Sequence, residues 1–367
     1  AVEIVDACLI GRKEVFMHKP NFGIFGDGKE IAQIAMAKVF RKGDFRAGYY
    51  RDQTFMFAIG ELTVQQYFAQ LYAHTSLEAD PASAGRLMNG HYATRFLDDK
   101  GKYINLTEAK NSSADISPTA GQMPRLLGLA YASKLFRHNP ALKEFSYLSN
   151  NGNEIAFGTI GNASTSEGMF FEAVNAAGVL QVPMLISVWD DDYGISVPQE
   201  YHTTKLSISK ALAGFQRSDS EKGFEIITVK GWDYMGLIEA YQRAETICRE
   251  EHVPVLFHVQ EMTQPQGHST SGSHERYKSK ERLAWEVEND CIRRMREWII
   301  SEVLILPEEV DAIEKEAKAS ARQAKERAWR AFNNDVRKDQ AKVTEILENA
   351  IQQSERKEQI LAIKNDL

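Results

Sequence analysis

Two polar segments near the middle of the chain combine residue types that could hold a phosphate group and its counter-ion. The first, GTIGNASTSEG at residues 158–168, is a glycine-containing turn between an apolar run and an amphipathic segment. Its first two glycines allow a tight bend, and the first N–H groups of a following helix form an anion site. Ser164 and Glu167 have the S-x-x-E spacing of a capping box, which predicts a helix start at about Thr165. Taken alone, the turn is more typical of a well-capped connection than of a phosphate loop.

The second segment, WDDDYGISVP at residues 189–198, makes a phosphate site more plausible than a simple capped connection. Three successive aspartates at the end of a buried strand are costly unless a cation lies nearby. If the two preceding strands are parallel neighbours, Asn162 and an aspartate of residues 190–192 can face one ion. Carboxylate, amide and backbone carbonyl oxygens, with a diphosphate, would satisfy Mg²⁺. An exposed acidic turn is the alternative interpretation.

Four nearly continuous apolar segments predict strands that are covered on both faces. They are residues 153–160, 182–189, 224–231 and 253–260. Helical periodicity lies between them, at residues 166–181 and 234–251. The alternation predicts an α/β fold with a parallel sheet flanked by helices. Ligands of such sheets bind at the carboxyl ends of the strands.

The first 140 residues and the last 60 differ from this middle part. Helices are expected at residues 28–40, 63–76 and 121–136, and the loops RAGYYRDQ (46–53) and GRLMNGHYATRF (85–96) concentrate Tyr, Arg, His and Gly, which is typical of functional loops. Residues 311–367 contain no Gly or Pro, and 23 of 57 are charged. This predicts a long amphipathic helix that serves packing or oligomerisation. The expected division is an α/β domain of residues 1–305 and a charged helical tail of residues 306–367.

The composition excludes several classes of protein. A net charge of −7 argues against nucleic acid as the main partner. The three cysteines are far apart, match no metal-ligand spacing and are expected to be reduced thiols. No apolar run approaches 18 residues, so no membrane span is expected. No signal peptide is evident, although a removed transit peptide remains compatible with this start. The expected compartment is the cytoplasm, or the mitochondrial matrix of a eukaryote.

At this point the chain resembles a known family. Residues 166–198 follow the pattern SEGxFxEAxNxAxxLxxPxxxxxxxxxYxISxP. This looks like the thiamine diphosphate motif of the alpha subunit of the decarboxylating component of 2-oxo acid dehydrogenase complexes, of the branched-chain or pyruvate type. The likeness continues in four further motifs, in the family's order: YYR (49–51), GRxMxxHY (85–92), SPxxxQxP (117–124) and GHSTS (267–271). GHSTS slightly favours the branched-chain type.

The resemblance implies a thiamine diphosphate-binding fold and oxidative decarboxylation of a 2-oxo acid with thiamine diphosphate and Mg²⁺. Residue by residue, it implies a set of cofactor contacts at Tyr50, Arg51, Ser117, Gly161, Asn162, Ala163 and Ser164. The implied metal ligands are Asn162, Asp191 and the backbone carbonyl of Tyr193. The implied catalytic residues, at the substrate end, are His91 and His268, since histidine suits proton transfer near neutral pH.

The resemblance also implies partners. A beta subunit would supply the glutamate that activates the aminopyrimidine, either in an α2β2 assembly or fused in a longer chain. A lipoyl acyltransferase of the complex would receive the acyl group. Without the beta part, the chain is expected to be inactive.

Departures from the family pattern leave a second hypothesis open. The family usually has an acidic residue at position 162 and an amide residue at position 191. Here the two types are exchanged, as Asn162 and Asp191, so one carboxylate would still face the ion. Thr119, Trp189 and Gln264 also depart from the usual residue types. The alternative is therefore a non-catalytic scaffold or regulatory homologue of the same fold. An unrelated nucleotide enzyme is disfavoured, because the chain lacks G-x-G-x-x-G and G-x-x-x-x-G-K-[ST].

Overall fold

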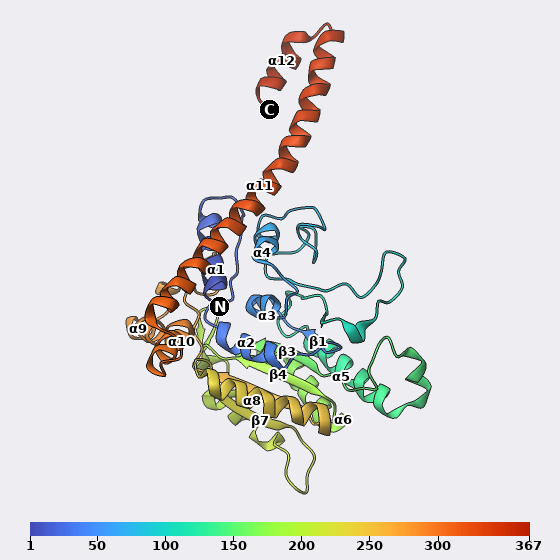
Figure 1. The fold of residues 1–367 in the computed structure, drawn as a ribbon, viewed down its shortest axis with the longest axis vertical. Coiled ribbons are helices and arrows are strands. Elements are labelled where there is room, and N and C mark those ends of the chain that lie inside the picture. Colours follow the sequence, from blue (N-terminus) through green and yellow to red (C-terminus); the bar gives the residue numbers. More distant parts are fainter.

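Six parallel strands form the central sheet of the computed structural model, which describes residues 1–367 (Figure 1). Their order is β2-β1-β3-β4-β8-β7. The strands are β1 (Phe45–Ala47), β2 (Asn111–Ser112), β3 (Ala156–Gly161), β4 (Met184–Trp189), β7 (Glu225–Lys230) and β8 (Val255–Gln260). A separate hairpin pairs β5 (Tyr193–Gly194) with β6 (Val197–Pro198). The predicted parallel sheet is confirmed. β1 and β2 were missed because two or three residues are too short to show a period.

Helices cover both faces of this sheet. The helices of the chain are α1 (Val2–Phe16), α2 (Glu30–Val39), α3 (Gln53–Ala58), α4 (Val64–Leu71), α5 (Met123–His138), α6 (Gly168–Leu180), α7 (Ile208–Ala211), α8 (Tyr234–Thr246), α9 (Lys280–Glu288), α10 (Cys291–Ser301), α11 (Pro307–Gln353) and α12 (Lys357–Asn365). Of these, α2 and α8 lie on one face of the sheet and α5 and α6 on the other. The five helices predicted in the first 251 residues correspond to α2, α4, α5, α6 and α8.

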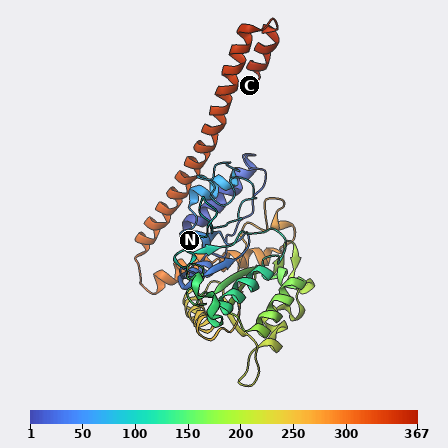
Figure 2. The ribbon, with the colours of Figure 1, turned by 90° about the vertical axis from the view of Figure 1, so that its right-hand side faces the viewer.

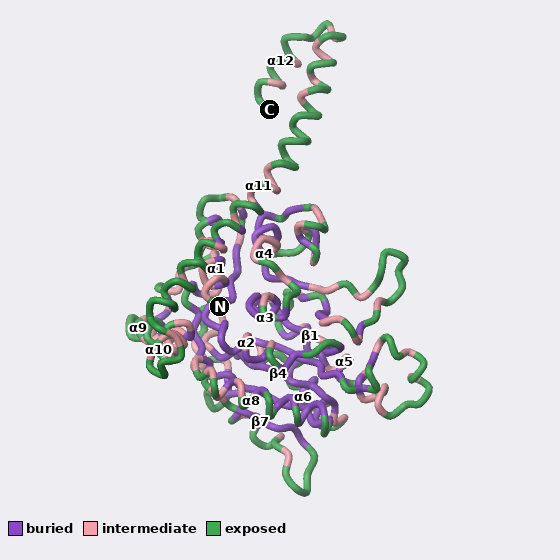
Figure 3. The backbone as a smooth tube through the Cα atoms, viewed as in Figure 1, coloured by how far each residue is buried: buried purple, intermediate pink, exposed green.

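The sheet separates two apolar layers because neighbouring side chains of a strand point to opposite faces. Phe157 and Leu185 pack with residues of α2 and α8, whereas Ala156 and Met184 pack with residues of α5 and α6. The strands therefore lie in the buried centre of the molecule (Figure 3). Burial on both faces explains why these segments are apolar almost without interruption.

The capping box and helix start predicted after β3 are wrong. Residues Ala163–Ser166 form a turn of 3-10 helix, and α6 begins at Gly168. Thr165 donates its hydroxyl to the carbonyl of Asn162 at 2.6 Å, which tightens the turn. Glu167 has an extended backbone conformation, with φ −73° and ψ 142°, and interrupts the helix there.

The charged tail is the long helix that the sequence predicted. The first half of α11 packs on α1 and α4, with Ala321 and Ala328 buried and the ring of Trp329 lying 4.9 Å from that of Tyr72. Beyond this contact the helix leaves the body, and α12 folds back along it (Figures 1 and 2). The role of this arm and the domain boundary at residues 305–306 stay predictions. No helix of the chain is both long and apolar enough to cross a bilayer.

Candidate functional site

A cavity of about 430 Å³ lies at the carboxyl ends of β3 and β4. It is lined by all of the site residues that the sequence predicted except His91 and Ser117, namely Tyr50, Arg51, Gly161, Asn162, Ala163, Ser164, Asp191, Tyr193 and His268. The other lining residues are Tyr49, Thr119, Glu167, Trp189, Gly194, Ile195, Gln264, Tyr277 and Lys278. Segments far apart in the sequence therefore meet where ligands of parallel sheets bind.

Strand pairing places the two polar segments on one cavity. Gly161, the last residue of β3, pairs with Trp189, the last residue of β4, and the backbone N–H of Asn162 donates to the Trp189 carbonyl at 3.1 Å. The β5–β6 hairpin also lies close to the turn. A Cβ atom on Gly194 would lie 2.5 Å from that of Ala163, so a glycine is required there. The expected juxtaposition of residues 158–168 and 189–198 is confirmed.

The aspartates flanking Asp191 have partners within the chain. Asp190 Oδ2 lies 2.7 Å from Nε2 of the buried His258 and accepts from the Gln199 amide at 3.0 Å. Asp192 forms a salt bridge with Arg282. These contacts offset the cost of ending a buried strand in consecutive carboxylates.

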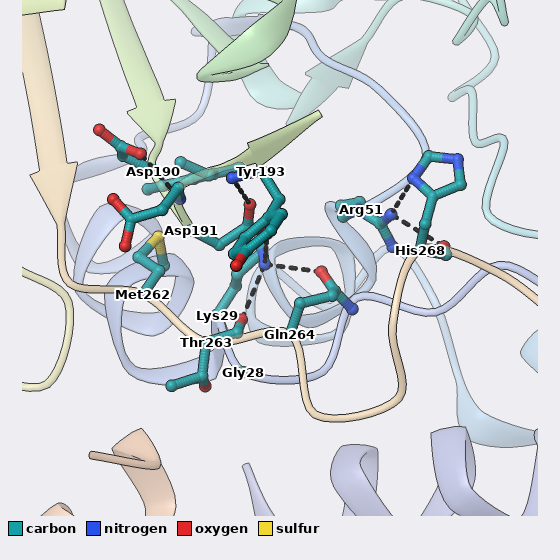
Figure 4. A network of polar contacts seen from close by, with 12 residues as sticks. Gly28, Lys29, Arg51, Asp190, Asp191, Tyr193, Met262, Thr263, Gln264 and His268 are labelled. Atoms are coloured by element: carbon teal, nitrogen blue, oxygen red, sulfur yellow. Dashed lines mark hydrogen bonds and ion pairs between the residues drawn. The ribbon is translucent and has the colours of Figure 1, made fainter. Parts of the chain in front are cut away.

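Asp191 is paired with a lysine that sequence reasoning missed (Figure 4). Lys29 is 1% exposed. Its Nζ donates to Asp191 Oδ2 at 3.0 Å, to the Thr263 carbonyl at 2.9 Å and to Gln264 Oε1 at 2.7 Å. All three protons of the ammonium are thus used. Lys29 immediately precedes α2 and falls inside the helix expected at residues 28–40, where a lysine is ordinarily a solvated surface residue. No local pattern therefore indicated its contact with Asp191, 162 residues away.

Close approach of two backbones brings Lys29 to this place. Gly28 has a φ of +88°, which favours glycine. A Cβ atom there would lie 2.3 Å from the Thr263 carbonyl oxygen. The turn before α2 therefore lies against the loop after β8. Burial raises the pKa of Asp191, but the charges of Lys29 and Arg51 lower it more, so its pKa lies below the ordinary value and the carboxyl is ionised at neutral pH.

Arg51 presents a buried cation to the cavity. It is 5% exposed, donates to the Phe25 carbonyl through Nη1, and donates through Nη2 to the backbone carbonyl and the ring Nδ1 of His268, both at 2.9 Å (Figure 4). None of its contacts is a carboxylate within salt-bridge distance. Because a guanidinium only donates, Nδ1 of His268 accepts, and the neutral ring carries its proton on Nε2.

Burial and the neighbouring Arg51 charge lower the pKa of His268 to about 4. We expect a carbon-detected NMR titration of the ring to show a midpoint well below the usual 6.5. Since the unfolded chain binds this proton first, the contribution of neutral His268 to stability is present above pH 6.5 and is lost as the pH falls towards 4. The difference in unfolding free energy between wild type and His268→Gln should change across that window. A midpoint at or above 6.5 would contradict this electrostatic arrangement.

His91 and Ser117 do not line the cavity but contact each other. Ser117 Oγ is 2.8 Å from Nε2 of the buried His91, whose Nδ1 is 3.0 Å from the Met88 carbonyl. The Tyr50 ring lies near both histidines, with its centroid 6.1 Å from that of His91 and 6.3 Å from that of His268. The role of His91 at the substrate end and that of Ser117 beside the aminopyrimidine stay predictions.

The residues present fit a diphosphate. Arg51 supplies a cation, and the side-chain nitrogen of Asn162, which is 2% exposed, is buried without a partner. A buried N–H donor without an acceptor is costly, and a phosphate oxygen would satisfy it. The cavity volume is also in the range of small-molecule sites.

The expected Mg²⁺ ligands do not fit the ion as they lie. The Asp191 carboxylate is already engaged by Lys29, and Asn162 carries no charge. No cluster of three or more His, Cys, Asp or Glu side chains suited to a metal ion occurs in residues 1–367. The magnesium assignment therefore stays a prediction, with the Lys29 contact against it.

Comparison with known proteins places these features in a family. The chain is similar to the alpha subunit of 2-oxoisovalerate dehydrogenase from Bacillus subtilis, with 28% identity over 65% of this chain and 61% of the relative. The Arabidopsis thaliana mitochondrial alpha subunit 1 is 25% identical over 76% of this chain and 51% of the relative. The human mitochondrial alpha subunit is 24% identical over 84% and 61%, respectively.

These alignments span between half and two thirds of the length of the relatives. The family model described as "Dehydrogenase E1 component" matches residues 16–337. That match covers all six strands and the cavity. The chain therefore belongs to the dehydrogenase E1 component family.

Proposed function

We propose that the chain is the alpha subunit of a thiamine diphosphate-dependent 2-oxo acid dehydrogenase component. It would decarboxylate a 2-oxo acid oxidatively and pass the acyl group to a lipoyl group of a partner acyltransferase. The observation that carries the proposal is the buried Arg51, without a carboxylate partner, beside the unpaired Asn162 amide in one cavity. Such a site suits an anionic cofactor group held at the ends of parallel strands.

In this proposal the chain positions the cofactor and the cofactor performs the carbon chemistry. Arg51 and the turn of residues 161–164 bind the diphosphate. When bound, thiamine diphosphate supplies the carbanion and the electron sink for decarboxylation. His268 lines the same cavity with its Nε2 proton available to donate, since Arg51 holds Nδ1 as an acceptor. It is the candidate to donate a hydrogen bond to the substrate carboxylate or keto oxygen.

A beta subunit is proposed to complete the site, as a separate chain or as part of a longer polypeptide. Apolar side chains are exposed along and after the β5–β6 hairpin: Ile195 is 62%, Tyr201 75% and Leu206 59% exposed. Ile195 also lines the cavity. Large apolar side chains that are exposed near one another in the chain are a feature of interaction surfaces, so this edge is where we place the partner.

The proposed substrate is a branched-chain 2-oxo acid rather than pyruvate. The support is the printed name of the relatives, 2-oxoisovalerate dehydrogenase, together with the GHSTS segment. The part of the pocket that would receive the substrate side chain is shared with the partner in this proposal.

The test is reconstitution with the beta partner, followed by calorimetric titration with thiamine diphosphate and an assay of 2-oxo acid decarboxylation. We expect saturable binding, and activity that is higher with 2-oxoisovalerate than with pyruvate. A complex that binds no thiamine diphosphate, with or without divalent cation, would rule the function out.

The second candidate is a scaffold or regulatory homologue of the same fold. One observation favours it: the Lys29–Asp191 pair occupies the expected metal ligand. Under this alternative the complex assembles with its partner but neither binds the cofactor nor decarboxylates any 2-oxo acid. The same titration and assay separate the two candidates.

A further inference from the structure

We propose that Lys29 takes the place of a divalent cation as the counter-ion of Asp191, so that the diphosphate binds here independently of Mg²⁺. This inference rests on the proposed diphosphate site. It concerns how the charge beside that site is balanced.

The surroundings of Lys29 are those of a small cation site. The ammonium is almost completely buried and contacts a carboxylate, an amide oxygen and a backbone carbonyl, each within 3.0 Å. These are the oxygen types that bind Mg²⁺ in proteins. The site thus already holds a positive charge, covalently attached to the chain.

That charge determines what Asp191 does to a bound anion. An unpaired carboxylate on the cavity wall would repel a diphosphate, because repulsion between like charges is strong in a poorly solvated site. With Lys29 Nζ 3.0 Å from its carboxylate, Asp191 forms an ion pair that has no net charge. The repulsion that a metal ion would otherwise relieve is then already offset.

The remaining lining groups can hold the diphosphate without a metal. Arg51 keeps its positive charge without a carboxylate partner. The buried Asn162 side chain has a donor nitrogen without an acceptor, which suits a phosphate oxygen directly. A metal-free diphosphate would therefore meet a cation and a neutral donor.

Wild-type chain, in complex with its beta subunit, is titrated with thiamine diphosphate, and separately with inorganic pyrophosphate, in Mg²⁺ and in EDTA. We expect dissociation constants within about threefold of each other in the two media. Binding that requires Mg²⁺ would overturn the inference and leave the proposed function standing. No binding in either medium would overturn both.

Three variants sharpen the test. Lys29→Met leaves Asp191 unpaired, so affinity in EDTA should fall at least about tenfold and Mg²⁺ should restore part of it. Asp191→Asn should bind as tightly as wild type or more tightly in EDTA, since the Lys29 charge is then free. The double variant is the matched control, because it removes both charges, and should again be insensitive to Mg²⁺. Loss of binding by Asp191→Asn in Mg²⁺, under conditions where wild type binds, would instead identify Asp191 as a metal ligand and overturn the inference. If Lys29→Met fails to fold, the wild-type comparison of Mg²⁺ with EDTA still tests the inference.

Discussion

Arg51→Ala is expected to weaken thiamine diphosphate binding roughly 30- to 1000-fold. Arg51 is the lining cation that lacks a carboxylate partner, and its guanidinium is almost completely buried. Losing a charge-assisted contact in such a site costs about 2–4 kcal/mol, and each 1.4 kcal/mol is about tenfold. Calorimetry on the complex with the beta subunit measures the change.

Two further variants define the cause of that loss. Arg51→Lys keeps a positive charge but loses the planar fork, so its affinity should lie between those of wild type and Arg51→Ala. Arg95→Ala is the matched control, since Arg95 pairs only with the exposed Asp99, and its affinity should be unchanged. In ligand-free Arg51→Ala, the pKa of His268 should rise, because Arg51 is one of the charges that lower it. A dissociation constant within threefold of wild type would remove Arg51 from the proposed site.

The sequence predicted those elements of the fold in which burial determines a recognisable pattern of apolar residues. β3, β4 and β8 are buried along almost their whole length, whereas the edge strand β7 is only partly buried. The apolar runs identified all four to within three residues. β1 has three residues, of which Arg46 is charged, and no period can be recognised in so short a segment. The start of α6 was misplaced for a different reason. The S-x-x-E spacing occurs, but the turn closes through Thr165 and Asn162 instead.

The candidate site could be predicted where its residues follow the strands directly. Asn162 and Asp191 come immediately after β3 and within two residues of β4, so parallel pairing alone brought their segments together. Lys29 could not be found this way, because it reaches the site from before α2 and is 162 residues from Asp191. Charge balance in the cavity depends on this long-range contact, and local sequence patterns do not encode it. The sequence therefore indicated that the segments of Asn162 and Asp191 meet, but not that a lysine pairs with Asp191.

The other large effect is on stability. Arg46→Met should lower the free energy of unfolding by about 3–5 kcal/mol. Arg46 is completely buried and forms salt bridges with the equally buried Asp52, at 2.6 Å, and Asp115, at 3.1 Å. Removing the guanidinium leaves two carboxylates in the core with no cation, which is far more costly than removing a solvated pair. Urea unfolding at neutral pH measures the loss.

The pH dependence distinguishes lost charge compensation from lost packing. Arg46 also donates to the Tyr49 carbonyl at 3.2 Å, so the variant could loosen the segment that carries Tyr50 and Arg51. Unpaired buried carboxylates have raised pKa values, and groups with raised pKa values stabilise the folded state below their unfolded pKa and lose that contribution as the pH rises. The deficit of Arg46→Met should therefore shrink as the pH falls from 7 towards 4, whereas a deficit due to packing would not. Arg95→Met, at an exposed pair, should change stability by less than about 1 kcal/mol at every pH. A deficit for Arg46→Met as small as that of the control would show that the buried aspartates do not depend on this arginine.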